Sequence, residues 1–504
     1  MTTAASSPSD RGGELVWIPA AVAAVAIGTL GIATVGAAHL STLAFLLLGA
    51  GLVVLLGVAA LRWPRAILVA LVLSPPLVDL YATQNLLPVA ARDMARFFSE
   101  GLLVVIAAIL VVVSARRRTL VSAVRHPFSL GLAVFLAVSA LSAVVNAVPP
   151  VVAASAMIFT LDAAVLFYLP RMVGYTHHQL HRTMWAAAIV VAIASVIAIL
   201  QALLTPSLLG ITPVVGQSGE GVRMGSLVAD PNILGTIIGM ALPFTIFSLV
   251  RTPPGRRRWL ILGAALAMGL ALVLTYSRGS WIGAAIGLGG VALIIDRRAF
   301  VAFALIMVVA YGTAVVMPKG LLTGGAVSLD PVQSTINRIG AIGEMRDLRA
   351  LFVANGLPIL EDNPVLGVGP GRYGGAAASV FGSPIHDRFK TDRLLTNQET
   401  VDNFWLHLGV EGGVAGIAAF LAMIGVALWA PIRAFRRTAG SRFSVPAGIV
   451  SGVVTVVVAV FTTMLLEGNT AAFLFWFLLG LGSMTLPAAV RTGDRPAAAT
   501  ACGG

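Results

Sequence analysis

The uncharged run NILGTIIGMALPFTIFSLV, residues 232–250, decides the class of fold. An α-helix needs about 20 mostly apolar residues to cross the hydrocarbon core of a bilayer. Runs of this kind recur along the whole chain, which is 58% hydrophobic and 11% charged and has a mean hydropathy of +0.95. This composition excludes a soluble multidomain protein. It predicts an all-α, polytopic integral membrane protein.

Fourteen apolar runs are long enough to be candidate spans, so we expect about 12–14 transmembrane helices. The third is the weakest because Pro75 and Pro76 interrupt it. The runs start near Val16, Ser41, Ala66, Phe97, Phe128, Val151, Thr183, Asn232, Leu260, Ser280, Phe300, Asn403, Val445 and Ala471. They divide the chain into a cytoplasmic tail (1–15), spans 1–11 (16–317), a large extracytoplasmic loop (318–401), spans 12–14 (402–490) and a second cytoplasmic tail (491–504).

The distribution of positive charge sets the expected orientation. With a cytoplasmic N-terminus, 21 of the 33 Lys and Arg residues fall on the cytoplasmic side, as the positive-inside rule requires. The short outer loops hold four, namely Arg92, Arg96, Arg223 and Arg278. Cations placed against this bias suggest an anion such as a phosphate at the outer face. The net charge of +12 therefore mostly reflects topology and not nucleic-acid binding, and the single cysteine, Cys502, excludes an intramolecular disulfide or a cysteine metal cluster.

Arg278 lies in TYSRGS, residues 275–280, where two spans meet with almost no loop. Helices on both sides would hold its guanidinium rigidly, which suits bidentate binding of a phosphate. The alternative is that Arg278 snorkels to lipid headgroups. Arg92 and Arg96 are four residues apart and would share one face of a short interfacial helix, where they could clamp a diphosphate or anchor the chain to the lipid surface.

Arg223 precedes the sequence Asp230-Pro231-Asn232. Pro231 fits the first turn of a helix and Asp230 its N-cap. The positive end of that helix would lie near the outer surface and favour an anion there. The alternative is a simple helix cap beside a solvated arginine.

The long outer connection, Met317 to Val401, carries eight basic and eight acidic residues. A loop of this length is usually functional or disordered. Ile336 to Ile359 has apolar residues at helical spacing, with Arg346 and Arg349 on another face, and this predicts an amphipathic helix packed on the membrane domain. The following NPVLGVGPG, residues 363–371, is too rich in Gly and Pro for a helix and predicts a tight, ordered turn.

The segment TNQETVDNFWLHLG, residues 396–409, carries this loop back into the membrane. Asp402 or Asn403 would cap the twelfth span, and His407 would lie one turn below Asn403 on the same face. A carboxylate that enters a span is costly unless it is paired or functional. Asp402 could be a general base near the arginines, or it could be the cap alone, with His407 as an interhelical hydrogen bonder.

Taken together, these segments resemble the O-antigen ligase and polymerase family of bacterial membrane glycosyltransferases, over roughly Met184 to Leu481. Four ordered matches carry the resemblance: Arg223 with DPNILG (230–235), Ser277-Arg278-Gly279, NP to GRY (363–373), and DNFWL (402–406) ending in EGGVAG (411–416). The resemblance implies a fold similar to other polyprenyl-dependent glycosyltransferases. It implies a glycan donor on polyprenyl diphosphate at the outer leaflet, and no metal or other cofactor, because arginines would neutralise the leaving diphosphate.

Carried over by position, Arg223 and Arg278 would be these arginines and Asn403 and Leu406 the signature at the end of the loop. Ligases of the family usually have His before that Asn, whereas this chain has Asp402, which favours a polymerase-like or divergent member. Asp402, Arg278 and Arg223 are therefore the candidate catalytic residues. The candidate substrate-binding residues are Asn403, His407, Arg372, Asn232, Arg92 and Arg96.

The function expected is an inverting, metal-independent glycosyltransferase of the bacterial plasma membrane, with both termini cytoplasmic. It would polymerise or ligate a lipid-linked glycan onto a glycan or lipid acceptor, with membrane lipids around it and no nucleic acid as partner. A transporter or flippase of lipid-linked oligosaccharide is the alternative, but the unexplained charges cluster at the outer interface and do not line a path across the membrane. A scaffold protein without catalytic activity is a third possibility, but it would not explain a structured loop that returns to the arginine residues.

Overall fold

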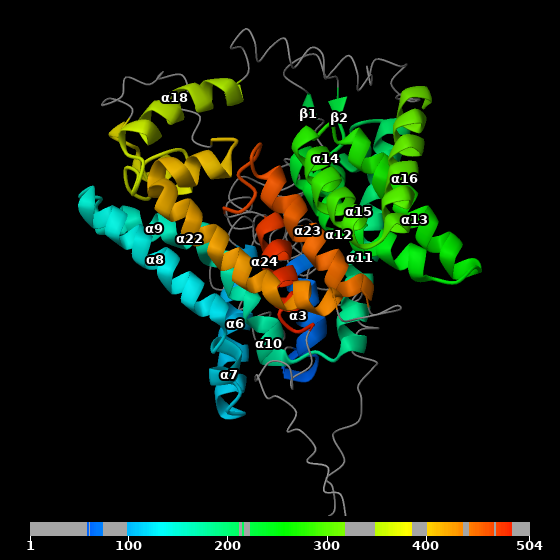
Figure 1. The fold of residues 1–504 in the computed structure, drawn as a ribbon, viewed down its shortest axis with the longest axis horizontal. Helices are drawn as coiled ribbons and strands as arrows, with labels where there is room; N and C mark the ends of the chain where they lie inside the picture. The colour runs from blue at the N-terminus through cyan, green and yellow to red at the C-terminus, as the bar shows by residue number, and fades with distance from the viewer. Residues whose placement is uncertain are drawn as a thin grey trace, which may run out of the picture.

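The computed structural model describes residues 58–59, 61–73, 98–210, 214–215, 222–317, 348–385, 401–436, 443–467 and 470–485. Helices dominate this part of the chain (Figure 1). Strands in it are limited to a short antiparallel pair, β1 (Val214–Val215) and β2 (Val222–Arg223). The all-α prediction is therefore confirmed.

The helices follow one another with short connections. Before the strands lie α3 (Pro64–Leu73), α6 (Phe98–Arg116), α7 (Leu120–Val124), α8 (Pro127–Val145), α9 (Pro150–Leu161), η2 (Asp162–Phe167), α10 (Leu169–Val173), α11 (His177–Leu203) and η3 (Leu208–Gly210). After the strands come η4 (Ser226–Val228), α12 (Pro231–Arg251), α13 (Arg256–Leu274), α14 (Arg278–Ala284), η5 (Ala285–Gly290), α15 (Val291–Ile295) and α16 (Arg297–Val316). The remaining helices are α18 (Leu348–Asp362), α19 (Ala376–Phe381), α22 (Phe404–Phe435), α23 (Ser444–Ala459) and α24 (Thr470–Gly482).

Eight helical segments of the described residues are long and apolar enough to cross a membrane: Pro127–Val145, Pro150–Val173, His177–Leu203, Pro231–Arg251, Arg256–Leu274, Arg278–Ile295, Arg297–Val316 and Phe404–Phe435. The shorter α3, α23 and α24 are also apolar. The predicted spans from Ala66 onward correspond to these helices and, for the span near Phe97, to α6. The largest difference is at α11, which begins six residues before Thr183. The two predicted spans near Val16 and Ser41 lie outside the described residues.

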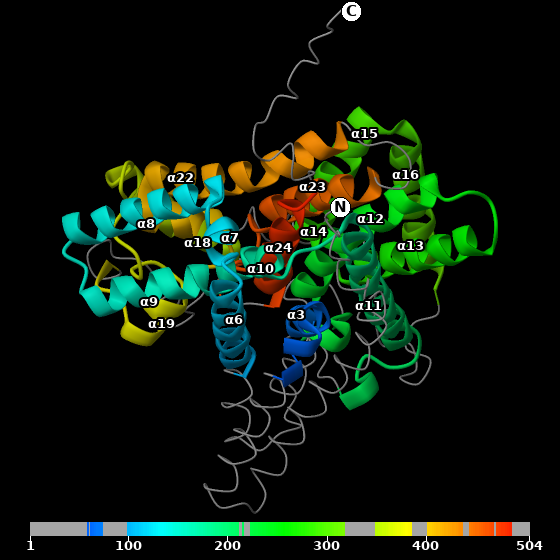
Figure 2. The ribbon, with the colours of Figure 1, turned by 90° about the horizontal axis from the view of Figure 1, so that it is seen from below.

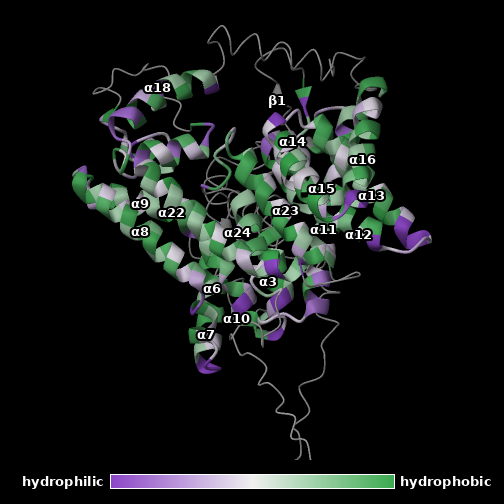
Figure 3. Ribbon diagram, viewed as in Figure 1, coloured by the Kyte–Doolittle hydropathy of each residue, from purple (hydrophilic) through white to green (hydrophobic). Residues whose placement is uncertain are grey.

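The connections divide between two ends of the helix bundle. Figure 1 shows β1, β2 and α18 at one end, and α7 and α10 at the other. Figure 3 shows hydrophilic residues toward these ends and hydrophobic residues along the helices between them. We call the first end the β end. The charge pattern of the sequence predicts that it is the outer face.

Two of the predicted spans are interrupted in the structure. The helix from Pro150 stops at Leu161, continues as the 3₁₀ segment η2 and resumes as α10. Pro170 explains part of this break, because proline lacks an N–H and its ring clashes with the carbonyl four residues earlier. The second interruption lies in α22 at Gly413, where φ is 63° and ψ is −168°. It shapes the candidate site described below.

The centre of the bundle is α12, which is buried along nearly its whole length (Figure 2). It packs against α11, α13, α14 and α23. Small residues let α23 approach closely, because a Cβ at Gly448 would lie 2.8 Å from the Phe244 Cα and one at Gly452 would lie 2.8 Å from the Met240 carbonyl oxygen. Close packing of small residues is a principal source of helix association inside a bilayer.

Three glycines spaced by four residues form a second seam, between α23 and the helix that starts at Arg278. A Cβ at Gly283 would lie 2.5 Å from the carbonyl oxygen of Thr455, and one at Gly287 would lie 2.5 Å from that of Ser451. Gly279 contacts Thr462 and Ala459 in the same way. We call Gly279, Gly283 and Gly287 the glycine seam. It brings the start of α14 against the end of α23.

The glycine seam predicts a specific loss of stability. Gly283→Ala should lower the free energy of unfolding by about 1–3 kcal/mol, because the methyl group overpacks a backbone contact. Gly263→Ala is the matched control, since Gly263 is in α13 and a Cβ there has nothing within 4 Å. The control should be neutral or stabilising by up to about 1 kcal/mol. Thermal unfolding of the detergent-purified variants measures both changes. Equal melting temperatures of Gly283→Ala and Gly263→Ala would contradict the close packing at the glycine seam.

Candidate active site

Arg278 begins α14 at the β end, directly after a strained turn. Tyr276 is 3% exposed and has φ of 53°, a left-handed conformation that is costly for a residue with a Cβ. The hydroxyl of Ser277 lies 2.9 Å from that of Ser280, and Ser280 lies 3.1 Å from Thr236 on α12. These buried hydroxyls hold the turn against α12. The structure thus places the half-buried Arg278 on a rigid support.

Arg223 reaches the same turn from β2. Its Nε donates to the Thr275 carbonyl at 3.0 Å, and its NH2 donates to Asn232 Oδ1 at 2.8 Å. The guanidinium therefore bridges the end of α13 and the first turn of α12. The structure thus brings together three of the predicted site residues, Arg223, Asn232 and Arg278, because Thr275, which Arg223 binds, lies three residues before Arg278. We call these three residues the arginine locus.

Asp230 caps α12 as the sequence predicts, with Pro231 at the first helical position. Its Oδ1 accepts from the backbone N–H of Asn232 at 2.6 Å and of Ile233 at 3.0 Å. The cap carboxylate thus already neutralises the positive end of this helix. Anion binding near this helix end stays a prediction, to which the neighbouring arginines would contribute charge.

The segment between Arg223 and Asp230 folds into the bundle. The Ser226 hydroxyl donates to the Ala194 carbonyl at 2.6 Å, and its N–H donates to Gln201 Oε1 at 2.9 Å, both on α11. Ser226 and Ala229 have φ of 51° and 59°. Strained residues of this kind persist where the surroundings determine them, often at functional sites.

Asp402 and Asn403 directly precede α22, also at the β end. Asn403 is the N-cap, because its Oδ1 accepts from the Leu406 N–H at 3.0 Å. Asp402 lies just before it, and its Oδ2 accepts from Arg349 NH2 at 3.1 Å. The Asp402 side chain is 47% exposed, so a solvent-borne molecule can reach it.

The chain at the end of α23, residues 459–462, contacts both the residue after Arg278 and the start of α22. We call it the turn after α23. The Phe404 N–H donates to the Val460 carbonyl at 2.9 Å, which holds the start of α22 against the turn after α23. The glycine seam packs the residue after Arg278 against the same turn, since a Cβ at Gly279 would lie 3.2 Å from the Ala459 carbonyl oxygen. Arg278 and Asp402 therefore flank one structural element and do not lie on opposite sides of the bundle.

The interruption of α22 at Gly413 is closed by the glycine-rich turn. The N–H groups of Val368 and Gly369 donate to the carbonyls of Val410 and Glu411 at 2.9 and 3.0 Å. In return, the N–H groups of Val414 and Ala415 donate to the carbonyls of Pro364 and Val365 at 2.8 and 3.2 Å. Backbone groups in a membrane domain must be satisfied by protein, and this exchange does so for a broken helix.

Glycines make this exchange possible. Gly367, Gly369 and Gly371 have φ of 63°, 101° and 80°, which an L side chain rarely adopts. Helix α8 supports the turn as well, because the Asn146 amide donates to the Gly367 carbonyl at 3.1 Å and the Ser142 hydroxyl donates to the Leu366 carbonyl. The predicted tight, ordered turn at residues 363–371 is confirmed.

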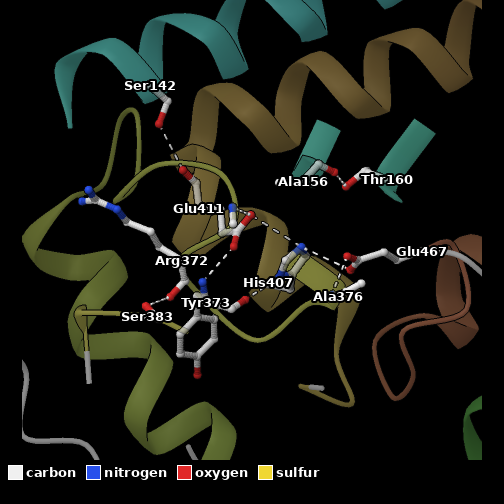
Figure 4. Close-up of polar contacts among 11 residues, drawn as sticks. Ser142, Ala156, Thr160, Arg372, Tyr373, Ala376, Ser383, His407, Glu411 and Glu467 are labelled. Atoms are coloured by element: carbon white, nitrogen blue, oxygen red, sulfur yellow. Dashed lines mark hydrogen bonds and ion pairs between the residues drawn. The ribbon is translucent and has the colours of Figure 1, made fainter. Parts of the chain in front are cut away.

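Glu411 ties the next part of the loop to α22. Its carboxylate accepts from the backbone N–H of Gly371 at 2.8 Å and of Tyr373 at 2.7 Å (Figure 4). The Glu411 side chain is 8% exposed, and these charge-assisted bonds offset part of its desolvation. The loop and the broken helix thus form one unit.

His407 lies beside Glu411 and Glu467 in the interior. Its Nε2 is 3.7 Å from Glu411 Oε2 and 3.5 Å from Glu467 Oε2, and its Nδ1 bonds the Tyr373 carbonyl (Figure 4). Glu467 Oε1 also accepts from the Ala376 N–H at 2.9 Å. His407 is 3% exposed. This position favours support of the loop over the substrate contact that the sequence suggests.

The other predicted site residues divide into two groups. Arg372 follows the glycine-rich turn, and its guanidinium donates to the Val368 and Ala147 carbonyls at 3.4 and 3.3 Å, away from the arginine locus. Arg92 and Arg96 lie outside the described residues. Of the predicted helix Ile336–Ile359, the described part is α18, which starts at Leu348 and ends three residues late, at Asp362.

Three features were missed by sequence reasoning. Glu467 received no role because it lies in the short connection between two apolar runs. Glu411 was noted within a motif, but its partners lie 40 and 38 residues away along the chain. Arg349 was placed on a different face of its helix from the apolar residues and was given no partner, whereas it pairs with Asp402. Of these three, Glu411 could have been found from the sequence, because a carboxylate inside an apolar run is costly unless it has a partner or a function.

No three His, Cys, Asp or Glu side chains in the described ranges are arranged to hold a metal ion. A comparison with models of protein families identifies a related family. Residues 263–421 match the family model described as O-antigen ligase. The matched segment runs from α13 into α22 and so includes Arg278, the large loop and Asp402. A search of curated proteins found no match.

The match supports placing the chain in an O-antigen ligase-like family, as the motif resemblance predicts. With its apolar helices, the chain is a multi-pass membrane protein of bacterial type. The family indicates a glycosyltransferase-like enzyme with a glycan ligation role in envelope polysaccharide synthesis. It also implies glycan and lipid-linked substrates.

The Glu411 contacts predict an effect on loop order. Glu411→Gln should leave one of the two backbone N–H groups facing an amide NH2, at a cost of about 1–3 kcal/mol. Limited proteolysis of the purified protein should then cut faster within residues 363–383. Glu361→Gln is the control, since Glu361 is exposed on α18. An unchanged cleavage rate for Glu411→Gln would argue against Glu411 as the support of the loop.

Proposed function

We propose that the chain is an outer-face glycosyltransferase that transfers a glycan from a polyprenyl diphosphate donor to a hydroxyl of a glycan or lipid acceptor. The observation that carries the proposal is the shared turn after α23. It contacts Gly279, the residue after Arg278, and accepts from the N–H of Phe404, two residues after Asp402. An arginine and a carboxylate thus lie near one element at the β end, which the charge pattern predicts to be extracytoplasmic. Both termini would then be cytoplasmic.

Arg223 and Arg278 would bind the donor diphosphate. Guanidinium groups match phosphate oxygens bidentately, and groups held in place before the reaction stabilise charge that develops during it. Asn232 would orient Arg223, since its Oδ1 accepts from the guanidinium at 2.8 Å. Arg92 and Arg96 would add charge at the same face. These contacts would stabilise the leaving group without a metal ion.

Asp402 would act as the general base. The acceptor hydroxyl oxygen attacks the anomeric carbon, the bond from that carbon to the phosphate oxygen breaks, and its electron pair leaves with the polyprenyl diphosphate. The hydroxyl proton passes to the Asp402 carboxylate, which completes an inverting displacement. Asn403 would fix the backbone at this position by capping α22.

His407 and Arg372 would shape the acceptor side. His407 anchors the loop through the Tyr373 carbonyl, and Arg372 binds the connection between α8 and α9 at Ala147. Both would act mainly through the position of residues 363–376. Asp402 in place of the usual His of ligases favours a polymerase-like or divergent member of the family.

The test is reconstitution of the purified protein with a polyprenyl diphosphate-linked glycan, with and without added divalent metal, and sizing of the products on a gel. A ladder of products indicates a polymerase, and one shifted band indicates a ligase. Movement of the lipid across the membrane without new glycosidic bonds would replace the proposal by a flippase. Loss of turnover after chelation would overturn metal independence.

Replacement of one arginine tests the diphosphate site. Arg278→Lys should lose most of the turnover, about 10²-fold, because a point charge replaces a bidentate fork. The control Arg298→Lys lies at the opposite end of the bundle and should keep normal turnover. Near-normal activity of Arg278→Lys would indicate that Arg278 contacts lipid headgroups alone.

Replacement of the carboxylate tests the base. Asp402→Asn should reduce kcat by about 10²–10⁴-fold, the range for loss of a general base, while donor binding changes little. Donor binding is measured separately by the thermal shift with the lipid-linked glycan. A kcat equal to that of the unaltered protein would leave Asp402 with a structural role at the helix start.

A further inference from the structure

Arg349 is the charged partner of Asp402. Its NH2 donates to Asp402 Oδ2 at 3.1 Å, and the two side chains are 29% and 47% exposed. Arg349 lies on α18, 53 residues before Asp402 in the chain. A contact so distant in sequence requires that the loop helix is docked in a defined place.

The docking of α18 is built from apolar and polar contacts. Phe352 and Ile359 are buried in one cluster with Leu406 and Val410 of α22. The Tyr373 hydroxyl donates to the Phe352 carbonyl at 2.8 Å. Burial raises the pKa of Tyr373, so this hydroxyl stays a donor through the neutral range. Arg349 therefore reaches Asp402 from a helix anchored to the first half of α22.

We propose that Arg349 is a positioning residue for Asp402, which holds the carboxylate ionised and oriented for proton transfer. This inference rests on the proposed function of Asp402 as base. An opposite charge in hydrogen-bond contact favours the ionised form of a carboxylate, and the bond to Oδ2 limits its rotation. The large loop thus contributes directly to the chemistry through α18.

Other charged groups near Asp402 set the background for the test. Arg278 lies across the turn after α23. On α22, His407 is turned inward between Glu411 and Glu467. On α18, Glu361 and Asp362 are exposed, twelve or more residues from Arg349 and so roughly 18 Å along the helix. Arg349 is the cation with a direct contact to Asp402 among the described residues of α18.

The experiment is the pH–rate profile of the full-length protein with the lipid-linked donor. Without Arg349, the carboxylate keeps its proton to a higher pH. Arg349→Gln should therefore move the acid limb of the kcat profile to higher pH. Turnover falls most on the acid side and recovers only in part at high pH, because the hydrogen bond that orients the carboxylate is also lost. Arg349→Lys should restore most of the shift, because it keeps the charge.

Two controls separate the possible outcomes. Glu361→Gln changes a charge on the same helix without contact to Asp402 and should leave the acid limb in place. Asp402→Asn combined with Arg349→Gln should be no slower than Asp402→Asn alone, because the two residues act as a unit. A uniform loss of turnover at every pH in Arg349→Gln would overturn the inference and indicate a purely structural contact.

These measurements distinguish a wrong role for Arg349 from a wrong proposed function. If Asp402→Asn keeps full turnover, Asp402 is not the base and the proposed function loses its catalytic group. If Asp402→Asn is inactive while Arg349→Gln keeps both the acid limb and kcat, the base stands and the role of Arg349 is rejected.

Discussion

The close approach of α14 and α23 is the constraint on which the candidate site depends. Inside a membrane, apolar side chains gain little by moving from lipid to protein, so helices associate through tight packing and hydrogen bonds. The glycine seam removes three side chains and lets the backbone carbonyls of Ser451 and Thr455 meet the facing helix. The start of α14 is thereby held against the turn after α23. Because that turn also binds the start of α22, one packing contact relates a guanidinium to a carboxylate.

The second constraint is the satisfaction of backbone groups in the broken helix α22. An interrupted helix leaves N–H and carbonyl groups without partners, and these are costly in an apolar medium. The glycine-rich turn supplies them, with Glu411 and His407 as side-chain ties to the loop beyond. A soluble loop and a membrane helix are in this way joined into one structure. The loop can then deliver Arg349 to Asp402 with a defined geometry.

These two constraints explain how charged side chains at the β end are held in defined positions. Arg223 and Asp402 each have a fixed polar partner on a helix or helix end, and hydroxyls of α12 and α14 support the turn before Arg278. Preorganised charges of this kind are what a reaction with a diphosphate leaving group requires. The family match covers Arg278, the loop and Asp402, while Arg223 lies before it and is related to the site by its bond to Thr275.

The sequence by itself determined the membrane class, the helices that correspond to the predicted spans from Ala66 onward, the cap at Asp230 and the ordered turn at 363–371, because these depend on local composition and on the conformations that Pro and Gly favour. It also singled out Arg223, Arg278 and Asp402 as chemically unusual. Tertiary structure decided the break in α22, the burial of His407 between two glutamates and the pairing of Arg349 with Asp402. Each of these depends on partners tens of residues away, and a local pattern carries no information on which distant groups will meet. The break is the clearest case, since Gly413 can continue a helix or end one, and the choice is made by the carbonyls of Pro364 and Val365 that receive the freed N–H groups.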